Sequence, residues 1–92
     1  MRKISNKSAK AALKKWEKKY ADVGPSYDTF DRRIRLRRII LGYEVLVKSI
    51  DRLNWVVDTD FADGDDFKRD RYNDWKGRIG AAENHIAWAK AR

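Results

Sequence analysis

The chain has 92 residues, 42% of them hydrophobic and 39% charged, which suits one small domain with a single core. With no cysteine and a single histidine, disulfides, thiolate catalysis and zinc sites built on these residues are excluded, so we expect no metal and no cofactor. Basic residues outnumber acidic ones by 22 to 14, for a net charge of +8. No stretch is apolar enough for a membrane span or an export signal. We expect a cytoplasmic protein, in the host cytoplasm if its origin is viral, without a membrane partner.

Two breaks divide the chain into three segments with helical periodicity. The first contains Gly24 and Pro25, because glycine can adopt the left-handed conformation that ends a helix and proline prevents its continuation. The second, residues 59–65, is polar and contains one glycine. No stretch alternates apolar and polar residues as a half-buried strand would. The sequence therefore predicts one all-α domain over residues 1–92, with helices at about 6–22, 29–58 and 66–90. We expect Asp28 to cap the second helix and Asp63 or Asp65 to cap the third.

The two long helices carry matching heptad seams, so we expect them to form an antiparallel hairpin. The seam residues are Leu36, Ile39, Tyr43, Leu46, Ile50, Leu53 and Val57 in the second helix, and Tyr72, Trp75, Ile79, Ala82, Ile86 and Ala89 in the third.

The second helix has another apolar stripe on nearly the opposite side, limited to its N-terminal half. This stripe consists of Phe30, Ile34, Leu41 and Val45. We expect it to receive the short first helix, whose own apolar stripe is Ala9, Leu13, Trp16, Tyr20 and Val23. The result is a three-helix antiparallel bundle or layer.

Positive charge is concentrated at one end of this arrangement. Residues 1–22 carry +6, residues 23–57 carry +3 and residues 58–92 carry −1. Because arginine offers forked donors to phosphate oxygens, a cationic pole where the first two helices meet indicates nucleic-acid binding that weakens with salt. The candidate nucleic-acid-binding residues are Lys14, Lys15, Lys18, Lys19, Arg32, Arg33, Arg35, Arg37 and Arg38. The alternative is a solvated face with ion pairs such as Asp28–Arg32 and Asp31–Arg35.

Two tryptophans, Trp55 and Trp88, lie off the heptad seams. Gly77 and Ala81 lie beside Trp88 on the third helix and would let another helix approach closely. These four residues form a candidate partner interface, for a second copy of the chain or for another protein.

One pattern is typical of catalysis. Arg78 and His85, separated by six residues on one helix face, resemble the Arg-x(4–6)-His signature of HEPN-type ribonucleases. The resemblance implies that the two residues act on the RNA phosphodiester, usually at a dimer interface. Ile79 stands where that family commonly has a polar residue, and the chain is one helix short.

The leading interpretation is thus a small basic helical protein that binds nucleic-acid backbone without sequence specificity. The alternative is a phage-type inhibitor or adaptor that docks on a host nucleic-acid-processing protein through its exposed tryptophans. A HEPN-like ribonuclease is the third. We expect no enzymatic activity and no small-molecule substrate.

Overall fold

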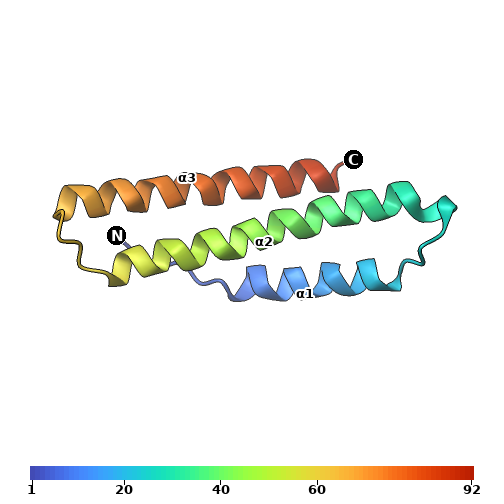
Figure 1. Ribbon diagram of the computed structural model, residues 1–92, viewed down its shortest axis with the longest axis horizontal. Helices are drawn as coiled ribbons and strands as arrows, with labels where there is room; N and C mark the ends of the chain where they lie inside the picture. Colours follow the sequence, from blue (N-terminus) through green and yellow to red (C-terminus); the bar gives the residue numbers. More distant parts are fainter.

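The computed structural model describes residues 1–92 and confirms an all-α chain. The elements are α1 (Lys7–Asp22), a short 3-10 turn η1 (Tyr27–Thr29), α2 (Phe30–Asp58) and α3 (Asp65–Lys90). Each helix lies within one residue of its predicted bounds. Consecutive helices run antiparallel along a rod of 55 × 19 × 17 Å (Figure 1). The radius of gyration, 16.2 Å, exceeds the roughly 12 Å expected for a compact domain of this length.

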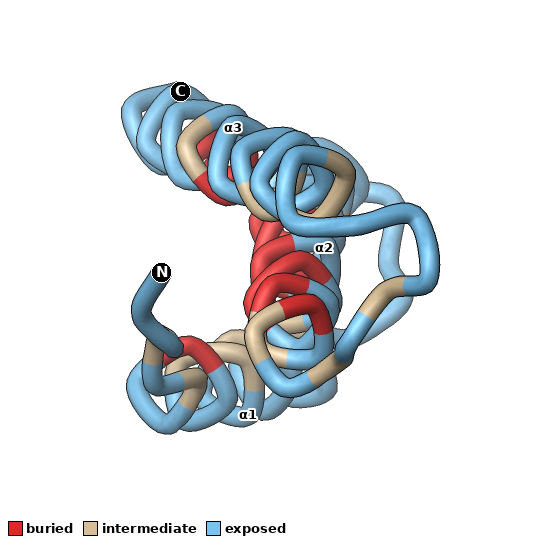
Figure 2. Tube along the Cα trace, turned by 90° about the vertical axis from the view of Figure 1, so that its left-hand side faces the viewer, coloured by how far each residue is buried: buried red, intermediate tan, exposed pale blue.

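The three helices form a layer rather than a closed bundle. α2 lies between α1 and α3 and packs against both, whereas the backbones of α1 and α3 do not come into contact. Seen along the rod, the helices form an open C, and the buried part of α2 faces its concave side (Figure 2). Side chains bridge the opening at one end, where the Tyr72 hydroxyl donates to the carbonyl of Arg2 at 3.1 Å.

The predicted hairpin between α2 and α3 is confirmed, and its seam supplies most of the core. Ile39 and Leu53 are fully buried, and Ile79 and Ile86 of α3 belong to the same core cluster. The helices approach closely at Gly42, where an added Cβ would lie 2.6 Å from Cγ1 of Ile86. Glycine is therefore required here for a packing reason.

The expectation that α1 covers the second stripe of α2 is wrong. Phe30, Leu41 and Val45 are 61%, 44% and 52% exposed, and Ile34 is 37% exposed. α1 packs instead on an apolar row that includes Leu36 and Tyr43 of the heptad seam and adds Ile40 and Val47 next to it. Because this row overlaps the seam, α1 and α3 bury one broad face of α2 between them.

The helix caps also differ from the prediction. Asp28 lies within η1, and the residue that precedes α2 is Thr29, whose hydroxyl donates to the carbonyl of Ser26 at 2.9 Å. α3 is preceded by Gly64, the one residue with a positive φ, at 94°. Gly24 therefore does not adopt the left-handed conformation. A short turn through Ser26 and Thr29 reverses the chain here without it.

The segment before α1 is fastened to the C-terminal half of α2. The Asn54 side chain accepts from the backbone N–H of Ile4 at 2.8 Å and donates to the Ile4 carbonyl at 2.7 Å. This reciprocal pair fixes the approach of α1. None of the helices combines the length and hydropathy that crossing a membrane would need.

Candidate nucleic-acid interface

The nine basic residues predicted to bind nucleic acid do not form one surface. At 3.6 residues per turn, the five arginines between residues 32 and 38 are distributed around α2. Some therefore lie beside α1, some beside α3, and some on the side that neither helix covers.

Arg33 belongs to the fold rather than to a free surface. It is half-buried, and its guanidinium donates to the Val23 carbonyl at 2.7 Å and to the Tyr20 hydroxyl at 3.0 Å. It also lies 4.5 Å from the centroid of the Tyr20 ring. These contacts hold the end of α1 against the start of α2, so Arg33 has little left to offer a ligand.

Three of the predicted cations do come together, in a hollow between the end of α1 and the start of α2. We call it the cationic hollow and define it by Trp16, Lys19, Arg32 and Arg35, which line it together with Leu36 and a single carboxylate, Asp22. The Lys19 ammonium lies 4.4 Å from the centroid of the Trp16 ring. The hollow therefore combines an aromatic surface with an excess of positive charge.

The C-terminal end of α3 closes one side of this hollow. Arg35 donates to the Lys90 carbonyl at 2.9 Å, while the Lys90 ammonium donates to the Tyr43 hydroxyl at 2.6 Å and lies 5.5 Å from the Trp16 ring. Lys90 thus links α3 to α1 across the opening. It adds a further cation next to the hollow.

The lysines of α1 divide between two sides of that helix. Lys15 and Lys19 are four residues apart and share a row. Lys14 and Lys18 form a second row that points away from the core. All four are exposed. Because Lys15 shares its row with Lys19, which lines the cationic hollow, Lys15 extends the positive charge beyond the hollow.

The ion pairs of the molecule lie away from this end. They join Lys3 to Asp58, Arg69 to Asp66 and Arg71 to Asp74. The intrahelical pairs considered from the sequence, Asp28–Arg32 and Asp31–Arg35, are not formed. The cations of the hollow therefore have no carboxylate within ion-pair distance.

The four candidate partner-interface residues do not share one surface either. Trp88, Gly77 and Ala81 are exposed on α3, and Trp88 is 43% exposed. Trp55 is 52% exposed but packs edge-on against Phe61, at 5.6 Å, beside the turn between α2 and α3. Trp88 lies next to Arg38, which is 17 residues from Trp55 along α2, or about 25 Å.

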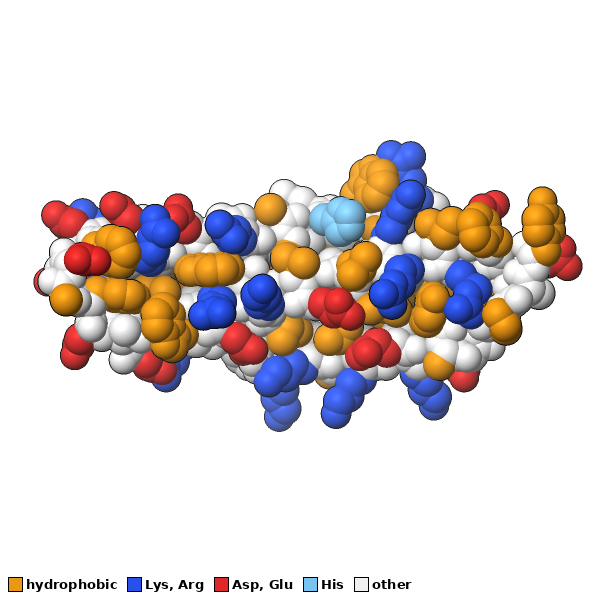
Figure 3. Space-filling model, in the orientation of Figure 1, with side chains coloured by type: hydrophobic (Ala, Val, Ile, Leu, Met, Phe, Trp, Pro, Cys, Tyr) orange, Lys and Arg blue, Asp and Glu red, His pale blue; other side chains and the backbone are white.

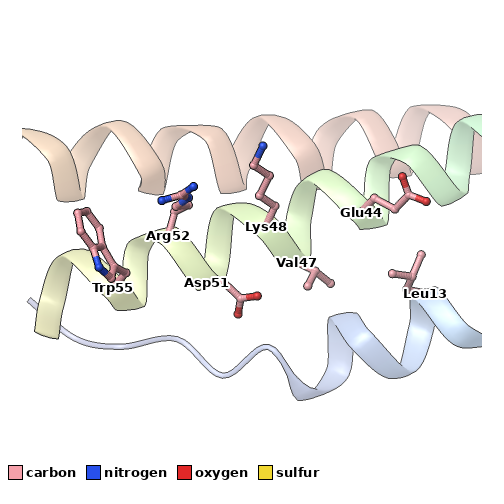
Figure 4. A pocket seen from close by; sticks show the side chains of 7 residues that line it. All are labelled: Leu13, Glu44, Val47, Lys48, Asp51, Arg52 and Trp55. Carbon is pink, nitrogen blue, oxygen red and sulfur yellow. The ribbon is translucent and has the colours of Figure 1, made fainter.

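Trp55 lines a different hollow, between α1 and α2 (Figure 4). Besides Trp55, its apolar lining residues are Leu13 of α1 and Val47 of α2. Its charged residues are two of each sign: Lys48, Arg52, Glu44 and Asp51. This balance offers no preference for a polyanion, in contrast to the cationic hollow.

Arg78 and His85, the pair with the ribonuclease-like spacing, line a common hollow on the α2–α3 side. Each is engaged with an aromatic ring: Arg78 lies 4.6 Å from the Trp75 centroid, and His85 stacks on Trp88 at 5.8 Å. The two side chains are thus drawn toward different tryptophans.

The exposure of Ile34, Leu41 and Val45 was not expected from the sequence. A signal for it was present, because the row of Ile40 and Val47 offered α1 a second apolar surface directly beside the heptad seam.

Comparison of the chain with protein-family models, with curated proteins and with solved structures finds no match.

Proposed function

We propose that this protein binds the phosphate backbone of nucleic acids through the cationic hollow. The observation that carries the proposal is the grouping of Lys19, Arg32 and Arg35 beside Trp16 with no ion-pair partner. Each such cation that neutralises a phosphate releases condensed counterions, which favours binding. Trp16 offers a ring on which an unpaired base can stack.

The arrangement of the cationic hollow favours contact with the phosphate backbone over readout of the base sequence. Its cations come from two packed helices, Lys19 from α1 and Arg32 and Arg35 from α2. No free helix projects from the layer to enter a major groove (Figure 1). The protein is thus expected to bind many sequences with similar affinity.

The test measures, by fluorescence anisotropy, how the affinity for labelled single-stranded and duplex oligonucleotides depends on salt concentration. The site variant carries Lys15→Gln, Lys19→Gln and Arg32→Gln, all of them exposed and without fold-holding hydrogen bonds. Its slope of log affinity against log salt concentration should be less steep by about 2–3 than that of the unmodified protein.

The control removes the same charge elsewhere, through Lys7→Gln, Lys10→Gln and Lys76→Gln, which are exposed residues without ion pairs. It should keep most of the affinity. Equal losses in both variants would mean that net charge alone attracts the oligonucleotide, and would contradict a site at the hollow. Replacing all five arginines between residues 32 and 38 is a poorer test, because Arg33 and Arg35 also hold helices together.

A further inference from the structure

The side of α2 and α3 that α1 leaves open carries a row of exposed apolar side chains. We call it the α2–α3 face and define it by Ile34, Leu41 and Val45 of α2 and by Ala81 and Trp88 of α3. Figure 3 shows hydrophobic side chains along both helices on this side, interspersed with Lys and Arg. The spacing of the α2 residues is that of a helix face that normally packs against another helix.

Two shallow hollows lie along this face. One, of about 450 Å³, is lined by Ile34 and Trp88, by three arginines, Arg35, Arg38 and Arg92, and by one carboxylate, Asp31, among others. The other, of about 460 Å³, includes Val45 and Ala81 in its lining. Ile34 and Val45 are eleven residues apart, so their hollows are separated by about 16 Å along α2. This is three helical turns, the distance between positions i and i+11 of a helix laid along the groove.

The rim of the face is cationic. Arg38 and Arg92 lie 6.0 Å and 4.4 Å from the centroid of the Trp88 ring, and Lys48 and Arg78 line the second hollow, which contains no carboxylate. None of these four cations forms an ion pair. A ligand that fits this face must therefore be apolar along its centre and negatively charged at its edges.

The exposed area is larger than a protein of this size normally has. The chain has 6690 Å² of accessible surface, whereas a folded monomer of 10.9 kDa is expected to have about 5,600 Å². The excess is comparable with the surface that one partner contributes to a standard interface, about 800 Å².

A second copy of the chain is a poor occupant for this face. A symmetric face-to-face dimer would bring the rim cations of both copies together, and such like-charge contacts are unfavourable. Single-stranded nucleic acid fits the rim but not the centre, because Ile34, Leu41 and Val45 are aliphatic and offer no ring for base stacking. The one ring of the face, Trp88, is already stacked with His85 and lies 4.4 Å from the Arg92 guanidinium.

We propose that the α2–α3 face binds an acidic amphipathic helix of a partner protein. The apolar side of that helix lies along Leu41 and places side chains at i and i+11 in the two hollows, while its Asp and Glu residues meet Arg38, Lys48, Arg78 and Arg92. This is the helix-in-groove mode of recognition. The inference does not rest on nucleic-acid binding: Arg35 borders both the cationic hollow and the α2–α3 face, but the apolar residues and the four rim cations of the face lie outside the cationic hollow.

The experiment is a selection from a displayed library of random peptides of about 16 residues, which span about 24 Å as a helix. The bait is the full chain. Enriched peptides should converge on helical apolar spacing with flanking Asp and Glu. Their affinity, measured by anisotropy, should fall at least tenfold for the variant Leu41→Gln/Val45→Gln. The matched control Tyr27→Gln removes a side chain that is 95% exposed outside the face and should bind as the unmodified chain does.

Other results overturn the proposal. Enrichment of basic or non-helical peptides, no enrichment, or equal binding by the Leu41/Val45 variant would contradict an acidic helix as the occupant. If light scattering finds a dimer for the unmodified chain and a monomer for the Leu41/Val45 variant, the face binds a second copy. If the same variant loses oligonucleotide binding, the face binds nucleic acid. The Lys15/Lys19/Arg32 variant should retain peptide binding, so failure of the two proposals can be told apart.

Discussion

The two apolar stripes of α2 differ in burial: the chain covers one and leaves the other exposed. Leu53, on the heptad seam of α2, is fully buried under its neighbours, whereas Leu41, on the other stripe, is 44% exposed. Both stripes have the periodicity of a packing surface. The difference teaches that periodicity identifies the apolar side of a helix without saying whether the same chain covers it. A stripe that the fold leaves open is a place to look for a partner.

The largest effect should come from truncating the covered stripe. Leu53→Ala leaves a cavity in the core and should lower the free energy of unfolding by about 2–5 kcal/mol. Leu41→Ala, at an exposed position, should change it by less than about 0.5 kcal/mol. Urea unfolding of both variants measures this. Similar losses would mean that Leu41 is covered in the free protein and would remove the contrast between the stripes.

Two arginines on different sides of α2 should likewise differ in how much their replacement destabilises the fold. Arg33→Ala removes charged hydrogen bonds to Val23 and Tyr20 and should lower the free energy of unfolding by about 1.5–3 kcal/mol. Arg37 is exposed, and Arg37→Ala should stay within about 0.5 kcal/mol of the unmodified protein. The same urea experiment separates them, and an equally damaging Arg37→Ala would show that Arg37 also holds the fold.

Two glycines sharpen the comparison further, with opposite signs. Gly42→Ala forces a Cβ against Ile86. Because overpacking outweighs the better helix propensity of alanine, stability should fall by about 1 kcal/mol. Gly77 has open space around it, so Gly77→Ala should raise stability by up to about 1 kcal/mol. Thermal unfolding followed by circular dichroism tests both signs. A stabilising Gly42→Ala would contradict the close approach of α2 and α3.

The helices and their antiparallel hairpin could be predicted because local signals specify them. Pro25 and the polar segment around Gly64 stop the helices, and the seams of α2 and α3 share the same heptad spacing. Side-chain links between distant positions carry no such signal. The apolar row of Ile40 and Val47 offers α1 a surface on α2. The stacking of Arg33 on Tyr20 and the pairing of Asn54 with Ile4 help to hold α1 there, and neither of these links is visible in periodicity.

The same limit applies to the candidate site. The clustering of basic residues at one end was visible in the sequence, but its division was not. Arg33 joins the fold, Arg32 joins the cationic hollow and Arg38 joins the rim of the α2–α3 face. Which side of α2 each arginine serves depends on where α1 and α3 pack, and the position of α1 was predicted wrongly.

The most direct test of nucleic-acid binding at the cationic hollow is an NMR titration. A single-stranded oligonucleotide is added to the isotope-labelled protein, and two-dimensional spectra record the shift of each backbone amide. Binding at the cationic hollow predicts progressive shifts at Trp16, Lys19 and Arg32, while the amides of Leu41 and Val45 on the α2–α3 face stay unchanged. Shifts centred on Leu41 and Val45, with the hollow unaffected, would contradict it.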